Sequence, residues 1–408
     1  MTRLRTRAAA GVLALLVALA GCTGTSQPSP STPTTSAPAT PTPQPDDEAA
    51  LPGLPKAVTQ KAVLGDPWSS RAGKVHGVAR SALAIIKQTR KGQTLTLSMF
   101  NLTYPGTADA LVRARRRGVA VRVLLNGEGA RSREVRILTA GLGSDMTRKS
   151  FVVVRPGGVR MHSKFLLVTA RDGAGPVVWV SSGNLTSASG RDQANEALIT
   201  TGDQRLYDFL RRQFTLMRQG VTDPRRLSRS ALTAGTFVRT YPLPKGGPAH
   251  DPILAVLNDV SCVHGNRRTV IRMAHLFLTA ERRYVTARMR ELVEQGCDLR
   301  VVARMGGWDR VVVTDLLRGG PGKVLLRAAR GSDLHTKITT VDGWNTAGER
   351  IKIALVGSHN LTGRALTKTP EGVNDELSVR IWNPATVQTY ERWVDMVIAK
   401  HSTAAKAA

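Results

Sequence analysis

The segments MHSKFLLVT (residues 161–169) and LHTKITTVD (residues 334–342) repeat each other within one chain of 408 residues. Each contains His-x-Lys, and each is followed a short distance later by Ser-x-Asn-Leu-Thr. A single short motif would carry little weight, but two copies in the same order are not expected by chance. The sequence therefore predicts an internal duplication in which each half contributes the same side chains: His162, Lys164, Ser182 and Asn184, then His335, Lys337, Ser358 and Asn360.

The order of expected strands and helices is also the same in the two halves. In the first half we expect strands over 94–99, 119–125, 151–154 and 177–181, and helices over 107–117 and 133–140. In the second half we expect strands over 269–273, 299–303, 323–326 and 353–357, and helices over 279–295 and 310–317. Each histidine motif is expected on a further strand, where residues i and i+2 share one face.

Strands that alternate with helices indicate a parallel or mixed sheet covered by helices on both faces. Each half has the size of a domain, so we expect an α/β fold of two α/β/α sandwiches, over residues 51–235 and 236–400. A pseudo-two-fold axis between them would place equivalent residues opposite one another at one shared active site.

The repeated side chains suit the cleavage of a phosphodiester. Lysine and asparagine donors can hold the non-bridging oxygens and balance the developing charge. One imidazole can attack phosphorus while the other protonates the leaving oxygen. Each histidine needs a partner on its second ring nitrogen, and Glu196 and Glu376, each before an apolar strand, are the candidates.

Other residues are candidates for contact with a substrate. Asn101 and His275 follow the first strand of each half, so both could line the cleft or be ordinary loop residues. His359 could touch substrate or face water, and Ser182 and Ser358 are also expected to bind substrate. The chain has no Cys/His cluster with the spacing of metal ligands, so we expect no metal.

With these paired motifs the sequence resembles the phospholipase D superfamily, whose motif is His-x-Lys-x4-Asp followed by Gly-Ser-x-Asn. The second half matches it fully and includes Asp342, whereas Thr169 stands at the aspartate position of the first half. The resemblance implies a reaction without metal or cofactor through a phosphohistidine, with His162 as nucleophile and His335 as acid. It also implies a structural role for Asp342; Asp172 is the nearest substitute in the first half.

The first fifty residues are expected to lie outside the fold. Residues 1–22 combine a basic start, a short apolar run and Leu-Ala-Gly-Cys, which predicts a lipoprotein signal with Cys22 lipidated, or an ordinary signal peptide cut nearby. Residues 23–50 are rich in Ser, Thr and Pro and predict a disordered linker. Residues 401–408 are expected to be a frayed tail. We thus expect export, with the protein anchored to the membrane by lipid or secreted.

The remaining cysteines and the net charge give expectations about a disulfide and about binding partners. Cys262 and Cys297 are the other two cysteines, and in an exported protein they could form a disulfide or remain buried thiols. The net charge of +28 favours polyanionic partners, either phospholipid or nucleic acid. We expect a monomeric phospholipase D first, a secreted endonuclease second, and an inactive polyanion-binding module third.

Overall fold

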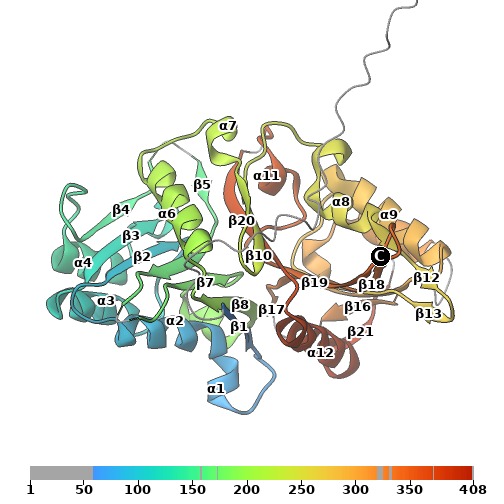
Figure 1. The fold of residues 1–408 in the computed structure, drawn as a ribbon, viewed down its shortest axis with the longest axis horizontal. Coiled ribbons are helices and arrows are strands. Elements are labelled where there is room, and N and C mark those ends of the chain that lie inside the picture. Colours follow the sequence, from blue (N-terminus) through green and yellow to red (C-terminus); the bar gives the residue numbers. More distant parts are fainter. Residues whose placement is uncertain are drawn as a thin grey trace, which may run out of the picture. The chain divides into compact units, whose positions relative to one another are not determined.

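Each half of the chain forms a sheet flanked by helices (Figure 1), and the two sheets have the same internal strand order. The computed structural model describes residues 58–156, 159–171, 173–318, 325–329, 333–370 and 372–406. The proposed signal, Cys22 and the linker lie outside the described residues, as does Asp172.

The first sheet has the order β1-β8-β7-β6-β2-β3-β4, in which β2, β3 and β4 run parallel and the other neighbours run antiparallel. Its strands are β1 (Thr59–Gly65), β2 (Thr94–Met99), β3 (Ala120–Leu125), β4 (Phe151–Val154), β6 (Phe165–Val168), β7 (Val177–Ser181) and β8 (Gln193–Thr201).

The second sheet repeats this order as β20-β19-β18-β14-β15-β16, with β10 and β9 beyond β20 and β21 beyond β16. Its strands are β9 (Ser230–Leu232), β10 (Thr236–Tyr241), β14 (Val270–His275), β15 (Asp298–Ala303), β16 (Leu325–Ala329), β18 (Lys337–Asn345), β19 (Arg350–Gly357), β20 (Asn374–Ile381) and β21 (Ser402–Ala404). β11 (Val260–Ser261) pairs with β18, and β12 (Val263–His264) pairs with β13 (Arg267–Arg268). The expected duplicated α/β fold is therefore confirmed.

The helices follow the strands in the same order in both halves. In the first half they are α1 (Ala72–Val75), α2 (Gly77–Gln88), α3 (Thr107–Arg116), α4 (Arg133–Leu142), α5 (Ser187–Arg191), α6 (Gln204–Arg218) and α7 (Pro224–Leu227). In the second half they are α8 (Pro252–Asn258), α9 (Arg283–Glu294), α10 (Arg310–Leu317), α11 (Gly363–Leu366) and α12 (Pro384–Lys400). Gly118 and Gly296, at φ of 89° and 97°, end α3 and α9 as expected. None of the helices in the described part of the chain combines the length and apolar character that crossing a bilayer requires.

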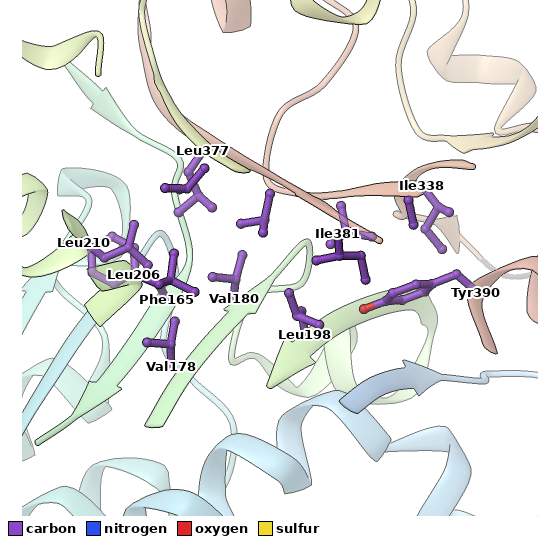
Figure 2. Packing of buried hydrophobic residues seen from close by; sticks show 14 of the residues in the cluster. Phe165, Val178, Val180, Leu198, Leu206, Leu210, Ile338, Leu377, Ile381 and Tyr390 are labelled. Carbon is purple, nitrogen blue, oxygen red and sulfur yellow. The ribbon is translucent and has the colours of Figure 1, made fainter. Parts of the chain in front are cut away.

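Because successive side chains of a strand point to opposite faces of the sheet, they pack into separate cores on its two faces. In β6, Phe165 and Leu167 join a central core, whereas Leu166 and Val168 join an outer core with α2, α3 and α4. The central core also takes in α6, α12 and strands of both halves, as the side chains in Figure 2 show. One continuous apolar core thus joins the two halves.

Two expectations about segments need correction. The histidine motifs do not lie within long strands: only β5 (Arg160–Met161) and β17 (Asp333–Leu334) precede them, and His162 and Lys164 lie between β5 and β6. The segment after His401 is not frayed throughout, because β21 pairs with β16 and Ser402 is buried. A strand of three residues is too short to be recognised from local composition, so the sequence did not predict this pairing.

Candidate active site

The two histidine motifs cross to the opposite half of the molecule. β5 pairs in parallel with β20 of the second sheet, and β17 pairs in parallel with β8 of the first. His162 then donates its backbone N–H to the carbonyl of Asp375 (2.8 Å), and His335 donates to the carbonyl of Ala194 (2.9 Å). A reciprocal exchange of this kind is what a two-fold relation between the halves produces. Each imidazole therefore lies against polar residues of the other half.

A carboxylate from the second half holds His162. Its Nδ1 lies 2.8 Å from Oε2 of Glu376, which is buried. The Ser358 hydroxyl donates to the same carboxylate (2.5 Å), and the Asn374 amide donates to Oε1 (3.0 Å). Burial opposes ionisation of Glu376, but His162, Lys164 and Ser358 outweigh it and keep the pKa of Glu376 below its ordinary value. Glu376 is thus a fixed negative charge that orients the His162 ring.

An amide, not a carboxylate, holds His335. Its Nδ1 lies 2.9 Å from Oδ1 of Asn195. The Asn195 nitrogen donates to the carbonyl (3.0 Å) and hydroxyl (3.1 Å) of Ser189 in α5, which turns Oδ1 toward the imidazole. Because Oδ1 of Asn195 can only accept, it favours the tautomer with the proton on Nδ1 and leaves Nε2 for chemistry. The Lys337 ammonium lies 3.1 Å from the same Nδ1.

The register of the exchanged strands is the same in both halves, so the asymmetry comes from the residue that stands at the equivalent position. Arg160 pairs with Asn374, so two residues later His162 is level with Glu376. Asp333 pairs with Gln193, so His335 is level with Asn195 and not with its neighbour Glu196. Because strand side chains alternate between faces, Asn195 meets His335 and its neighbour Glu196 does not.

The structure therefore contradicts our expectation that Glu196 would hold a histidine. Glu196 is fully buried, and its carboxylate accepts the backbone N–H of Lys337 at 3.2 and 3.3 Å. Its structural counterpart is Leu377, because Ser182 bonds the backbone of Glu196 just as Ser358 bonds that of Leu377. Burial raises the pKa of Glu196 to about 7, although Lys337 and Ser182 act in the opposite direction.

Each lysine contacts the histidine of its own motif. The Lys164 ammonium donates to the backbone carbonyl of His162, and the Lys337 ammonium donates to that of His335 (2.6 Å). The Phe100 ring packs beside the first motif, 5.4 Å from the His162 ring centroid and 5.4 Å from Lys164 Nζ. Both lysines are buried beside the histidines. Burial lowers the pKa of Lys164 well below its ordinary value, and Glu376 acts in the opposite direction.

The strand exchange brings the two motifs to one place, where their charges act on each other. Burial lowers the pKa of His162 to about 4; Glu376 opposes this, while Lys164 and Lys337 add to it. Burial also lowers the pKa of His335 well below its ordinary value, assisted by Lys337, Lys164 and His162. These mutual effects agree with the shared environment that the strand exchange creates.

The repeated asparagines and serines differ in their surroundings. Oδ1 of Asn184 and Oδ1 of Asn360 are both buried without a hydrogen-bond partner in the described structure. Unsatisfied buried polar atoms are rare in proteins and often mark functional sites. Ser182 and Ser358, which we expected to bind substrate, are fully buried, and their hydroxyls bond the strands that carry Asn195 and Glu376.

A buried ion pair that the sequence did not reveal supports the Asn360 turn. Arg282 donates to Asp251 from Nε (2.8 Å) and Nη2 (2.7 Å), and Nη1 donates to the carbonyl of Asn360 (3.0 Å). His359 is buried, not facing water: its ring stacks on Tyr241 at 4.1 Å, and its Nε2 lies 3.3 Å from Arg282. Nothing in the local sequence marks this arginine, because its acid lies 31 residues away in the chain.

Of Asn101 and His275, the other residues expected to line the cleft, the structure places His275 beside this cluster. His275 is buried and is level with Lys337 across β14 and β18, with Nε2 at 2.9 Å from the Thr339 hydroxyl. Burial lowers the pKa of His275 to about 3, with Lys337 acting in the same direction. Asn101 is half-buried and directly follows Phe100 at the end of β2.

The motif aspartate position is polar and satisfied in both halves. Asp342 forms ion pairs with Arg350 and with Lys352 (2.7 Å), and these contacts lower its pKa although burial opposes them. Thr169, which replaces the aspartate, accepts the backbone N–H of Thr94 on its hydroxyl (2.9 Å). The replacement thus leaves the end of the strand hydrogen-bonded.

Away from the site, Cys262 and Cys297 form a disulfide, which is one of the two alternatives that the sequence left open. Within the described ranges, no group of three or more His, Cys, Asp or Glu side chains is arranged to hold a metal ion.

Comparisons with known proteins agree with this geometry. A family model described as cardiolipin synthase, PLD-like domain, matches residues 83–218 and again residues 266–398. Phosphatidylserine synthase from Haemophilus influenzae Rd KW20 has a similar structure, with a TM-score of 0.55 and 11% identity, covering 85% of this chain and 87% of that one. Polyphosphate kinase from Porphyromonas gingivalis also matches, with a TM-score of 0.55, 14% identity and 85% coverage, but this chain spans only 52% of its length. No curated protein matches this sequence.

Proposed function

The chain belongs to the phospholipase D superfamily, and on that premise we propose that it cleaves phospholipid headgroup esters, or transfers the phosphatidyl group, through a phosphohistidine. Membership of this superfamily implies phosphodiesterase or phosphotransferase activity. The observation that carries the proposal is the meeting of His162 and His335 beside two lysines, with each Nδ1 held by the opposite half.

In the proposed first step, Nε2 of His162 attacks phosphorus and the bond from phosphorus to the leaving oxygen breaks. His335, as an imidazolium, gives its Nε2 proton to that oxygen. The Glu376 carboxylate stabilises the positive charge that the phosphorylated His162 ring acquires, whereas a neutral amide would not. The asymmetry between Glu376 and Asn195 therefore supports His162 as the nucleophile and His335 as the acid.

In the second step, Nε2 of His335 accepts a proton from water, the water oxygen attacks phosphorus, and the phosphorus–nitrogen bond breaks. An alcohol in place of water would give headgroup transfer. Lys164, Lys337, Asn184 and Asn360 are proposed to hold the non-bridging oxygens throughout. An anionic phosphate would also raise the pKa of His335, which burial and then the neighbouring cations depress before substrate binds.

The family description supports a phospholipid substrate, since cardiolipin synthase is its stated type. The excess of basic residues supports the alternative, a secreted endonuclease, because nucleic acids carry a dense negative charge. We further propose that the chain is exported and anchored through lipidated Cys22, on the strength of the Leu-Ala-Gly-Cys sequence.

One assay set separates these functions. Purified protein is given phosphatidylglycerol vesicles, phosphatidylcholine vesicles and plasmid DNA, each with excess chelator. Release of a free headgroup or of a transferred phosphatidyl product, with intact plasmid, supports the phospholipase. Nicked plasmid with intact lipid supports the endonuclease, and binding without turnover of any of them contradicts both.

A further inference from the structure

A cavity lies against the first half, outside the two-histidine site. Its volume is about 630 Å³, within the ~300–1,000 Å³ typical of small-molecule sites. Three segments line it: the start and exposed face of α2, the loop after β2, and α5. The lining residues are His76, Arg80, Leu83, Ala84, Lys87, Tyr104, Pro105, Ser187 and Arg191.

The cavity combines cations with an apolar wall. Arg80, Leu83, Ala84 and Lys87 follow one another at helical spacing, so a single face of α2 presents a guanidinium, an ammonium and two apolar side chains. Arg191 is already engaged by Asp192, at 2.7 Å. By contrast, neither Arg80 nor Lys87 makes an ion pair with any residue of the described ranges.

Two aromatic rings complete the apolar side. The rings of Tyr104 and His76 lie 5.8 Å apart, and Nδ1 of His76 is buried without a hydrogen-bond partner in the described structure. Gly190 in α5 allows this contact, because a Cβ there would lie 2.7 Å from Tyr104 and 3.1 Å from His76.

We propose that this cavity binds a phosphate monoester that carries an apolar body. Arg80 and Lys87 supply the positive charge that a phosphoryl group requires. Leu83, Ala84 and Tyr104 supply a surface for the apolar part. A ligand that is only anionic would leave this wall exposed to water, and a purely apolar one would desolvate two cations without compensation.

The cavity is connected to the catalytic cluster through α5. Arg191 and Ser187 line the cavity, while Ser189 between them accepts two hydrogen bonds from the Asn195 amide. Asn195 in turn holds His335 at 2.9 Å. The Tyr104 side is connected as well, because its backbone N–H donates to the carbonyl of Leu185 (2.7 Å), next to Asn184. A ligand that shifts α5 therefore alters the orientation of His335, a coupling that rests on the proposed function.

Calorimetric binding of dihexanoyl phosphatidic acid tests the site, with inorganic phosphate and dihexanoyl phosphatidylcholine as comparison probes. We expect the Arg80→Ala/Lys87→Ala variant to bind the phosphatidic acid at least tenfold more weakly than wild type. Ala84→Phe, which fills the cavity without changing charge at an exposed position, should have the same effect. Arg116→Ala removes an exposed cation from α3 and should bind as wild type does.

Equal binding by all variants, or equal binding of inorganic phosphate and the phosphatidic acid, would overturn the proposed site. The binding test needs no turnover, so it remains informative if the proposed reaction is not found. To test the coupling, dihexanoyl phosphatidic acid is added during phospholipid turnover. Turnover by wild type should change at least twofold, and turnover by Ala84→Phe should not change. Equal responses of wild type and Ala84→Phe, or no response in either, would overturn the coupling but not the proposed binding site.

Discussion

Asn195 and Glu376 occupy equivalent positions but give the two histidines different chemistry. A carboxylate on Nδ1 favours the charged imidazole, whereas an amide oxygen only fixes the tautomer. Since Glu376 is buried and receives hydrogen bonds from Ser358 and Asn374, its charge and position are both fixed. A duplicated site thus need not be chemically symmetric, and this asymmetry is the basis of the roles proposed for the two histidines.

Replacing the two buried glutamates by glutamine should separate their functions. Glu376→Gln removes the charge that stabilises the His162 imidazolium, so we expect kcat to fall by roughly 10²–10⁴-fold with little change in KM. Glu196→Gln keeps the acceptor for the Lys337 N–H and should lower kcat less than tenfold. Steady-state kinetics on the substrate found in the assay set measure both. Equal losses would contradict the assignment of Asn195 as the partner of His335.

Glu196 also predicts a pH dependence of stability. Burial raises its pKa from 4.5 to about 7, so between these values the folded chain binds more protons than the unfolded chain and stability falls as pH rises. Glu196→Leu, which introduces the residue found at the equivalent position 377, removes this loss. Relative to wild type, its free energy of unfolding should rise by roughly 3 kcal/mol between pH 4.5 and pH 7.

Urea denaturation of both proteins at several pH values measures this difference. Glu196→Gln is the matched control, because it removes the titration and keeps a hydrogen-bond acceptor. Parallel stability curves for wild type and Glu196→Leu would show that Glu196 does not titrate in this range.

The sequence identified the main residues of the candidate site but not all of the contacts between them. His162, Lys164, His335 and Lys337 were evident because the motif is repeated. Glu196 was misassigned because neighbouring strand residues point to opposite faces, and only the long-range pairing of β17 with β8 decides which one meets His335.

At the scale of elements, the regular strands and helices were predictable and the short connecting pieces were not. β2, β4, β7 and α10 begin and end where hydrophobic periodicity and capping placed them. β5 and β17 have two residues each, and β21 has three, so their pairing depends on distant partners and not on local propensity. These short strands nevertheless carry the histidines across to the opposite half.

The disulfide should stabilise the second half. Cys262 and Cys297 are 35 residues apart and tie the end of β11 to the start of β15 across α9. Closing a loop of this length stabilises a fold by about 2–4 kcal/mol in the chain-entropy account. We expect Cys262→Ala/Cys297→Ala to lose that much in chemical denaturation, with reductant lowering wild type but not the variant. A variant as stable as oxidised wild type would contradict this role.

At the scale of the whole molecule, the shared core and the shared site make the two halves interdependent. The central apolar cluster draws residues from both sheets, and α6 and α12 pack within it (Figure 2). The charge belongs to the same folded part: the three arginines and three acids of residues 1–50 cancel, which leaves +28 for residues 51–408. A polyanionic surface should therefore be attracted by the folded part itself, whether or not the site turns over.

Binding and turnover should then respond differently to salt and to loss of a histidine. Screening shortens the range of electrostatic attraction from about 10 Å at 0.1 M salt to about 3 Å at 1 M. We expect affinity for phosphatidylglycerol vesicles to fall at least tenfold between these salt concentrations, as measured by vesicle co-sedimentation. His162→Ala should bind vesicles as wild type does at each concentration, because it removes a ring that is neutral at pH 7, but it should release no product. If salt left binding unchanged, the attraction would have to come from apolar contacts, and if His162→Ala retained turnover, the two-histidine mechanism would be wrong.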